Sequence, residues 1–173
     1  MKIIKTKRFI LRPMVLKDAK DIARNINNWN VIKNLSQLPF PYELKHAKQF
    51  ARRKEMEMKK EKPEDYVMMI EIDGEVVGAV GAHKIVHGHK AEIGYWLAEK
   101  HWGKGIMPEA VKKFMTHIFS EFRLRRICAF AHADNVKSMN VMKKVGMQFE
   151  GIHKKYTIKD GKYIDCHMYA KVK

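Results

Sequence analysis

Hydrophobic and polar positions alternate with the period of strands through the middle of the chain. Tyr66–Ile72 and Glu75–His83 are apolar, β-branched runs, and the dipeptide Asp73-Gly74 between them is typical of a tight hairpin. A second turn at 87–90 precedes a further apolar run, Ala91–Leu97. The pattern therefore predicts a three-stranded meander.

The spacing changes to that of an amphipathic helix after this meander. Apolar residues recur at intervals of three and four between Met107 and Phe122. Arg126–Ala131 then predicts another strand. Because the strand 91–97, the helix and the strand 126–131 form one βαβ unit, we expect two parallel neighbouring strands with a right-handed crossover.

Further elements are predicted toward both ends of the chain. On the N-terminal side they are a strand at Phe9–Leu11 that Pro13 ends, a helix at Lys17–Ile26, and a long exposed helix from Tyr42 to Glu61 before Pro63. On the C-terminal side they are a helix at Asn135–Val145 capped by Gly146, and strands at Phe149–Ile158 and Lys162–Ala170 joined by Asp160-Gly161. Since no repeat or low-complexity linker interrupts them, we expect one α/β domain with a mixed sheet over residues 1–173.

Composition narrows the class of protein. A chain of 173 residues with 46% apolar residues can bury one sizeable core. No apolar run is long enough to cross a bilayer, and residues 1–7 lack the features of a signal peptide. Cys128 and Cys166 are too few for a disulfide framework. These features predict a cytoplasmic protein without a membrane partner, and they leave monomer and homodimer open.

The charge of the chain is strongly positive, with 35 Lys+Arg against 19 Asp+Glu and a net charge of +16. A field of this sign attracts anions such as coenzyme A, nucleic acid or the ribosome surface, without identifying which one. The run Arg52–Lys62 alternates in sign, which is typical of a solvated helix face. Electrostatic contact with the ribosome is the alternative for that run.

A Gly-x-Gly sequence lies between the strand 91–97 and the helix that follows it. Gly103 and Gly105 allow the backbone to approach a ligand closely, and the helix N-terminus directs N–H groups and a positive dipole toward it. Lys104 adds a positive charge, and Pro108 loses no hydrogen bond in the first helical turn. The segment is interpreted as a pyrophosphate cradle, with a tight βα turn as the alternative.

The same segment resembles a known motif. Lys100-His-Trp-Gly103-Lys-Gly105 is similar to motif A of the GNAT superfamily of N-acetyltransferases, Arg/Gln-x-x-Gly-x-Gly/Ala, with Lys100 at the first position. The wider run, Gly94-Tyr-Trp-Leu97 with Pro108-Glu-Ala110, resembles the branch that acetylates the N-terminal alanine or serine of ribosomal proteins.

The resemblance extends over nearly the whole chain. Residues 6–13 and 17–22 resemble the opening strand and helix of that branch, 135–138 and 142–147 its motif B, and 159–165 its closing hairpin. It implies the GNAT fold, a mixed, mostly antiparallel sheet with a central splayed parallel strand pair flanked by helices. It also implies that acetyl-CoA is the co-substrate, with pantetheine between the strands 91–97 and 126–131, and that no metal is needed.

Carried over by position, the resemblance implies a set of coenzyme A contacts. The implied residues are Trp96, Leu97, Ala98, Lys100, Trp102, Gly103, Lys104, Gly105, Ile106, Met107, Pro108, Asn135 and Ser138.

Two residues are candidates for proton transfer. Glu92 is the carboxylate within the apolar run 91–97 and is the expected base, with a sheet-face glutamate paired to a cross-strand lysine as the alternative. Ser138 is the expected donor to the leaving thiolate, with an exposed helical serine as the alternative.

The acceptor is an amine that must lose a proton before it attacks. At pH 7 roughly a tenth of a protein α-amine is neutral, against well under a hundredth of a lysine side chain. An N-terminal acceptor therefore needs less help, and we expect a protein N-terminus such as that of a ribosomal protein. The alternatives are a small amine such as a polyamine or aminoglycoside, which the positive charge disfavours, and a non-catalytic RNA-binding domain.

His83, His87 and His89 cluster at one predicted turn. A zinc site needs further ligands with fixed geometry, and no Cys or second His pair lies near in sequence. The cluster is therefore interpreted as a surface turn rather than a metal site.

Overall fold

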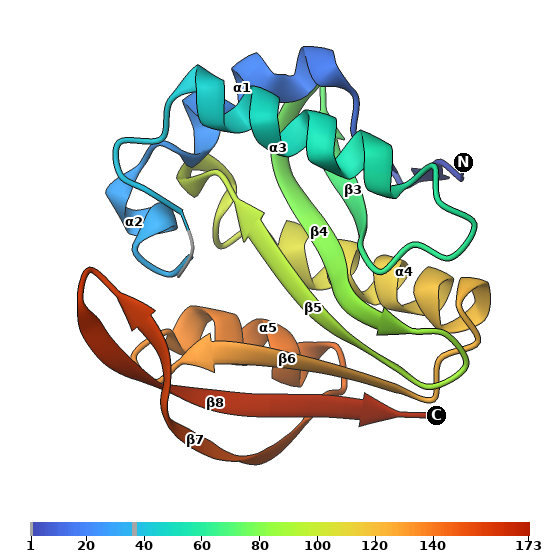
Figure 1. Cartoon of the computed structure of the whole chain (residues 1–173), viewed down its shortest axis with the longest axis vertical. Helices are drawn as coiled ribbons and strands as arrows, with labels where there is room; N and C mark the ends of the chain where they lie inside the picture. The colour runs from blue at the N-terminus through green and yellow to red at the C-terminus, as the bar shows by residue number, and fades with distance from the viewer. Residues whose placement is uncertain (1, 36–37) are drawn as a thin grey trace.

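One mixed sheet organises the computed structural model, which describes residues 2–35 and 38–173 (Figure 1). Over these residues the sheet has eight strands in the order β1-β2-β3-β4-β5-β6-β8-β7. The strands are β1 (Ile4–Lys5), β2 (Ile10–Pro13), β3 (Tyr66–Ile72), β4 (Glu75–Val86), β5 (Lys90–Leu97), β6 (Arg126–His132), β7 (Gln148–Lys159) and β8 (Lys162–Val172). The helical elements are η1 (Leu16–Asp18), α1 (Ala19–Ile26), α2 (Trp29–Ile32), α3 (Leu44–Glu57), η2 (Glu99–His101), α4 (Ile106–Glu121) and α5 (Val136–Lys144).

The helices cover both faces of the sheet, so two apolar cores form. On one face α4 and α5 pack on the strands, with Phe114 and Ile127 fully buried. On the other face α1, α2 and α3 bury residues such as Ile22 and Met69. Figure 1 shows α1 and α3 in front of the sheet and α4 behind it. Alternate residues of a strand therefore enter different cores.

The strands β5 and β6 form the parallel pair, and their pairing is short. It runs from Lys90 opposite Arg126 to Glu92 opposite Cys128, while β5 pairs with β4 along its whole length to Leu97 opposite Gly78. Beyond Glu92 the two strands part. The predicted α/β fold with a splayed parallel pair is confirmed.

Most predicted elements are present, and the differences concern short elements that were not predicted and the ends of longer ones. The meander is confirmed, with β3 at Tyr66–Ile72 as predicted and β4 extended to Val86. The two-residue β1 and the single-turn α2 were not predicted, because neither is long enough to show a period.

The predicted helix from Tyr42 to Glu61 is shorter at both ends and spans Leu44–Glu57. At its start, the N–H of Tyr42 donates to Asn27 Oδ1 (2.9 Å), so this residue is tied to the end of α1. At its end, Glu57 Oε1 accepts a hydrogen bond from the N–H of Glu64 (2.9 Å), which turns the chain back toward β3. Local charge patterning cannot reveal either contact.

In the part of the chain that the structure describes, no helix is long and apolar enough to span a membrane.

The close approach of β4 and β5 predicts a strong effect of Gly78→Ala. A Cβ at Gly78 would lie 2.6 Å from the carbonyl oxygen of Trp96, so the strands would have to separate. We expect a loss of about 1–3 kcal/mol in the free energy of unfolding, measured by denaturant titration. Gly94→Ala is the control, because its Cβ would lie 3.8 Å from the nearest atom, in His83. An equal loss in both variants would contradict this packing.

Candidate functional site

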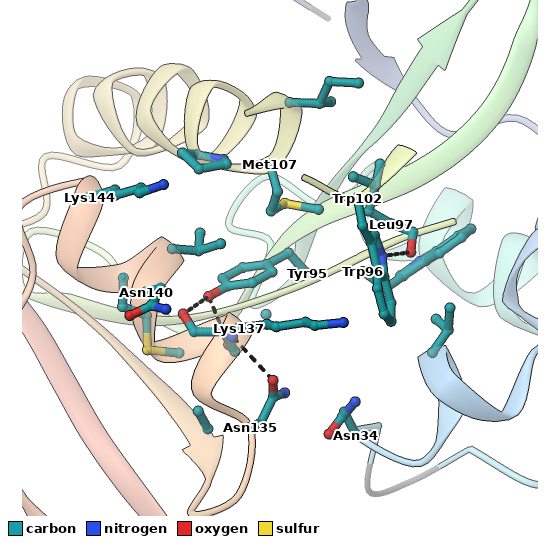
Figure 2. Close-up of a pocket in the computed structure, with 18 of the residues that line it drawn as sticks. Asn34, Tyr95, Trp96, Leu97, Trp102, Met107, Asn135, Lys137, Asn140 and Lys144 are labelled. Carbon is teal, nitrogen blue, oxygen red and sulfur yellow. Dashed lines mark hydrogen bonds between the residues drawn. The ribbon is translucent and has the colours of Figure 1, made fainter. Parts of the chain in front are cut away.

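A cavity of about 700 Å³ lies where β5 and β6 part (Figure 2). Its wall includes Gly94 of β5, Phe130 of β6, Met107 of α4, Ser138 of α5 and Val31 of α2. Because Met107 belongs to the core under α4 and α5 while Val31 belongs to the core under α1–α3, the cavity reaches both faces of the sheet. A ligand can therefore be approached from two sides at the opening between the strands.

The N-terminus of α4 forms one end of this cavity. Gly103 (φ 75°) and Gly105 (φ 73°) both adopt the left-handed conformation, and Gly105 is the N-cap of the helix. Glycine takes this conformation without strain, so the chain can turn sharply into α4. Gly105 and Ile106 line the cavity, where the unpaired N–H groups and the positive end of the helix dipole attract an anion.

Arg8 holds the cradle from outside. Its Nη1 donates to the carbonyl oxygen of Lys104 (2.6 Å) and its Nη2 to that of Gly105 (3.2 Å). The guanidinium also pairs with Glu109 in the first turn of α4. The loop carbonyls are thereby fixed toward Arg8, on the outside. Sequence reasoning missed Arg8 because it lies 96 residues before Lys104.

Tyr95 and Ser138 meet across the cavity. The Tyr95 hydroxyl lies 2.9 Å from Ser138 Oγ and donates to the Ser138 carbonyl oxygen at 3.1 Å. Asn135 caps α5, because its Oδ1 accepts a hydrogen bond from the N–H of Ser138 (3.1 Å). Burial raises the pKa of Tyr95 far above its usual value, against a smaller lowering by the bond to Ser138, so the hydroxyl keeps its proton. Tyr95 was not predicted as a site residue, although it lies in the motif-bearing run.

Cations from α5 also line the cavity. Lys137 Nζ lies 4.3 Å from the ring centroid of Trp102, and the indole N–H of Trp102 donates to the Leu97 carbonyl oxygen (2.8 Å). Lys144 lines the wall about two turns further along the same face of the helix (Figure 2). These charges make the cavity favourable for an anionic ligand. Sequence reasoning missed both lysines because many surface lysines look alike in the sequence.

His101 supplies a second indication that a ligand belongs here. Its Nε2 is buried and has no hydrogen-bond partner among the described residues, and the residue lines the cavity. Burial, with smaller effects of Lys100 and Lys104, lowers its pKa. A buried polar atom without a partner costs free energy unless a ligand or water satisfies it.

The structure brings most of the predicted coenzyme A contacts together. Those that line the cavity are Trp96, Leu97, Trp102, Gly103, Gly105, Ile106, Met107, Pro108, Asn135 and Ser138. Ala98, Lys100 and Lys104 are not part of the wall. Lys100 Nζ instead binds both carboxylate oxygens of Glu75 at 3.0 Å. Its predicted phosphate contact stays a prediction.

Glu92 lies outside the cavity wall, at the last residue pair before the strands part. Its Oε2 is 3.0 Å from Lys84 Nζ, which is the pairing that the alternative interpretation expected. Its role as a base stays a prediction.

The histidines of the β4–β5 region have separate partners. His83 Nδ1 lies 2.8 Å from Asp65 Oδ1, and His87 Nε2 lies 3.0 Å from the Pro63 carbonyl oxygen. Within residues 2–35 and 38–173 no group of three or more His, Cys, Asp or Glu side chains could hold a metal ion. His83 and His87 therefore bind different partners on different parts of the chain.

These features together fit a thioester of coenzyme A. The cradle at α4 suits a pyrophosphate, the gap between β5 and β6 suits the narrow pantetheine arm, and the hydroxyl pair of Tyr95 and Ser138 lies in its wall. Backbone groups of β5 beyond Glu92 have no partner on β6 and are free to pair with an amide. The chemistry available is transfer of an acyl group to a nucleophile.

A family model described as an acetyltransferase (GNAT) domain matches residues 8–148. The chain belongs to the GNAT family of acetyltransferases. The predicted enzyme class, an acetyl-CoA-dependent N-acetyltransferase, is thereby confirmed at the level of the family.

Individual relatives agree with this assignment. An uncharacterized N-acetyltransferase, p20 of Bacillus licheniformis, is 29% identical over 174 residues that cover 100% of this chain and 97% of the relative. The ribosomal-protein-serine acetyltransferase of Escherichia coli (strain K12) is 33% identical over 107 residues, 61% of this chain and 60% of the relative.

Solved structures share the fold. The microcin C7 self-immunity acetyltransferase MccE, in complex with acetyl-CoA and AMP, has a TM-score of 0.88 at 26% identity, covering 97% of this chain and 94% of its own. RimL, a ribosomal L7/L12 α-N-protein acetyltransferase in complex with coenzyme A, has a TM-score of 0.89 at 22% identity, covering 99% and 98%.

The cradle predicts that Gly105→Ala weakens acetyl-CoA binding. An alanine cannot adopt φ 73° without strain, so the first turn of α4 shifts and hydrogen bonds to phosphate are lost. We expect Kd to rise about tenfold or more by isothermal titration calorimetry, because a hydrogen bond to a charged group contributes about 1.5–3 kcal/mol.

Gly161→Ala is the matched control, because Gly161 has φ 75° in the β7–β8 turn and its added Cβ would meet no atom within 4 Å. Both variants should lose similar stability, and only Gly105→Ala should lose affinity. An unchanged Kd for Gly105→Ala would reject the cradle.

Proposed function

We propose that this protein transfers the acetyl group of acetyl-CoA to the N-terminal α-amine of a protein, with a ribosomal protein as the acceptor. The observation that carries the proposal is the cavity that crosses the sheet between β5 and β6. Its α4 end suits the donor, and its α2 end is open to an acceptor.

The α2 end of the cavity is built by segments far apart in the chain. Val31 and Leu35 line it, and Lys159 at the end of β7 donates from Nζ to the carbonyl oxygens of Leu35 (3.3 Å) and Leu38 (2.9 Å). Asn34 points into the same region (Figure 2). Lys159 therefore ties the β7–β8 hairpin to Leu35 and Leu38, next to the end of the cavity proposed for the acceptor. An opening at this end suits the flexible end of a polypeptide.

The relatives support the protein N-terminus as acceptor. The E. coli relative acts on a ribosomal-protein serine, and RimL is an α-N-protein acetyltransferase of ribosomal L7/L12. The net charge of +16 would draw the enzyme toward an anionic particle such as the ribosome and would repel a polycationic acceptor.

The geometry also supports direct transfer within a ternary complex. The neutral amine attacks the thioester carbonyl carbon, backbone N–H groups at the end of β5 polarise the carbonyl oxygen, and a hydroxyl protonates the thiolate that leaves. Ser138 Oγ and Tyr95 Oη are the hydroxyls in the cavity wall that are placed for this last step.

An acceptor panel tests the proposed function. Thiol release from acetyl-CoA is followed with serine- and alanine-initiated peptides, the same peptides with blocked N-termini and one internal lysine, a polyamine and an aminoglycoside. We expect turnover with the free α-amines and at least about tenfold lower kcat/KM for the lysine peptides at pH 7, because far fewer of their amines are neutral. Turnover confined to the polyamine or the aminoglycoside would reject the proposal.

The hydroxyl pair predicts a defect in turnover rather than in donor binding. Ser138→Ala and Tyr95→Phe each remove one hydroxyl of the pair, so kcat should fall about 10–100-fold while the KM for acetyl-CoA changes little. Ser120→Ala, on the exposed side of α4, should leave both constants unchanged. A raised KM with normal kcat would instead assign the pair to binding alone.

A further inference from the structure

A chain of charged side chains lies on the sheet face that α3 covers. Lys54 of α3 is buried, with 3% of its side chain exposed, and its Nζ lies 2.6 Å from Asp65 Oδ2. The other oxygen of Asp65 is 2.8 Å from His83 Nδ1. The hydrogen bond from His83, aided by Lys54, holds the pKa of the Asp65 carboxyl well below its usual range. Burying an ammonium group is costly, and this one keeps Asp65 ionised and in place.

The bond to Asp65 determines which nitrogen of His83 can accept a proton. An ionised carboxylate is an acceptor only, so Nδ1 must carry a hydrogen. In the neutral ring the lone pair is then on Nε2. No hydrogen bond to Nε2 is found among the described residues, and 37% of the His83 side chain is exposed. Nε2 is therefore the ring nitrogen without a hydrogen-bond partner among the described residues, on a side chain that is partly exposed.

The distances from two glycines show where this nitrogen lies. A Cβ added to Gly81 would lie 3.1 Å from His83 Nε2, and one added to Gly94 would lie 3.8 Å from it. The ring thus lies over the backbone of β4 and β5. Gly94 lines the cavity near the point where β5 leaves β6, so Nε2 lies next to this opening on the α3 side, while His83 itself is not part of the cavity wall. Tyr95 and Ser138 lie on the α5 side.

We propose that His83, oriented by Asp65, is the base that takes the proton from the acceptor amine. This rests on the acetyl transfer of the proposed function. The ammonium gives one proton to Nε2, and the neutral nitrogen bonds to the thioester carbon. As the C–S bond breaks, the second proton leaves the nitrogen and the thiolate sulfur gains one through the hydroxyl pair. The products are the amide, the thiol and one proton, which His83 returns to water.

Glu92 is the rival base in the same region. It lies directly opposite His83 in the β4–β5 register, but its carboxylate is paired with Lys84. Lys84 follows His83 at the irregular end of β4, where its φ is 51°. Removing Glu92 would free this lysine and leave the Asp65–His83 pair intact.

The charged and titratable groups around His83 come from α3, β4, β5, β7 and the segment before β3. They are Lys54 of α3, Asp65 before β3, Lys84 of β4 and Glu92 of β5, and Tyr156 of β7 interacts electrostatically with the last two. The pH dependence of kcat therefore includes any contribution of two carboxylates, two ammonium groups and one phenol as well as that of the imidazole.

The test compares pH profiles of kcat for wild type and His83→Gln. The acceptors are a serine-initiated peptide and, as a generic probe of an α-amine, glycinamide at high concentration. We expect kcat of His83→Gln to fall about 100-fold at pH 7. The defect should shrink to less than about fivefold at pH 9, where most of an α-amine is neutral without help. Glu92→Gln should stay within about threefold of wild type.

The control is His89→Gln, the same substitution at an exposed histidine of the neighbouring turn, which should leave both profiles unchanged. An acetyl-CoA-induced rise in Tm equal to that of wild type shows that His83→Gln is folded and binds the donor. A defect of the same size at every pH, or a normal His83→Gln with a defective Glu92→Gln, would overturn the proposal.

If the proposed function is wrong, the experiment gives a result that differs from the one expected when only the role of His83 is wrong. Wild-type turnover of glycinamide without turnover of any peptide rejects the protein acceptor, and the His83 profile is then read with glycinamide. If the wild-type protein releases no thiol with any acceptor, the proposed role of His83 as a base is rejected together with the proposed function.

Discussion

The short parallel pairing of β5 and β6 is the constraint on which the site depends. The two strands share hydrogen bonds only from Lys90 opposite Arg126 to Glu92 opposite Cys128, while β4 and β8 hold their outer edges. The sheet can therefore open at its centre without losing cohesion. The opening removes partners from the backbone of β5 beyond Glu92, and a bound amide can replace them. The α4 cradle and the α5 N-cap Asn135 both lie at this opening because the chain crosses from β5 to β6 through α4.

Different groups of residues reach the opening from the two faces of the sheet. The side of α4 and α5 carries the cradle, Lys137 and the Tyr95–Ser138 pair, which suit an anionic donor and its leaving group. The side of α1–α3 carries Val31 and Leu35 of the cavity wall, the end proposed for the acceptor, and the Lys54–Asp65–His83 chain. In the proposed mechanism, the base that takes a proton from the amine and the hydroxyls that protonate the thiolate thus lie on opposite faces of the sheet.

Much of the fold could be predicted from the sequence because its strands and helices are long enough to show a period. Tyr66–Ile72, the hairpin at Asp73-Gly74 and the helix that begins near Met107 are examples. Most of the candidate donor residues that line the cavity could be named from the sequence because they lie together in the Gly-x-Gly segment, and the structure brings Asn135 and Ser138 to the same cavity. Arg8 and Tyr95 were missed as site residues because their roles depend on contacts with residues that are distant in the chain.

A crystal structure of the protein with bound coenzyme A would test the central claim most directly. We expect density for the pantetheine arm between β5 and β6, with the pantetheine amides paired to the backbone of 93–97. The pyrophosphate of coenzyme A should lie at the N-terminus of α4. Coenzyme A bound elsewhere, or β5 and β6 paired beyond Glu92 with the gap closed in the complex, would contradict it.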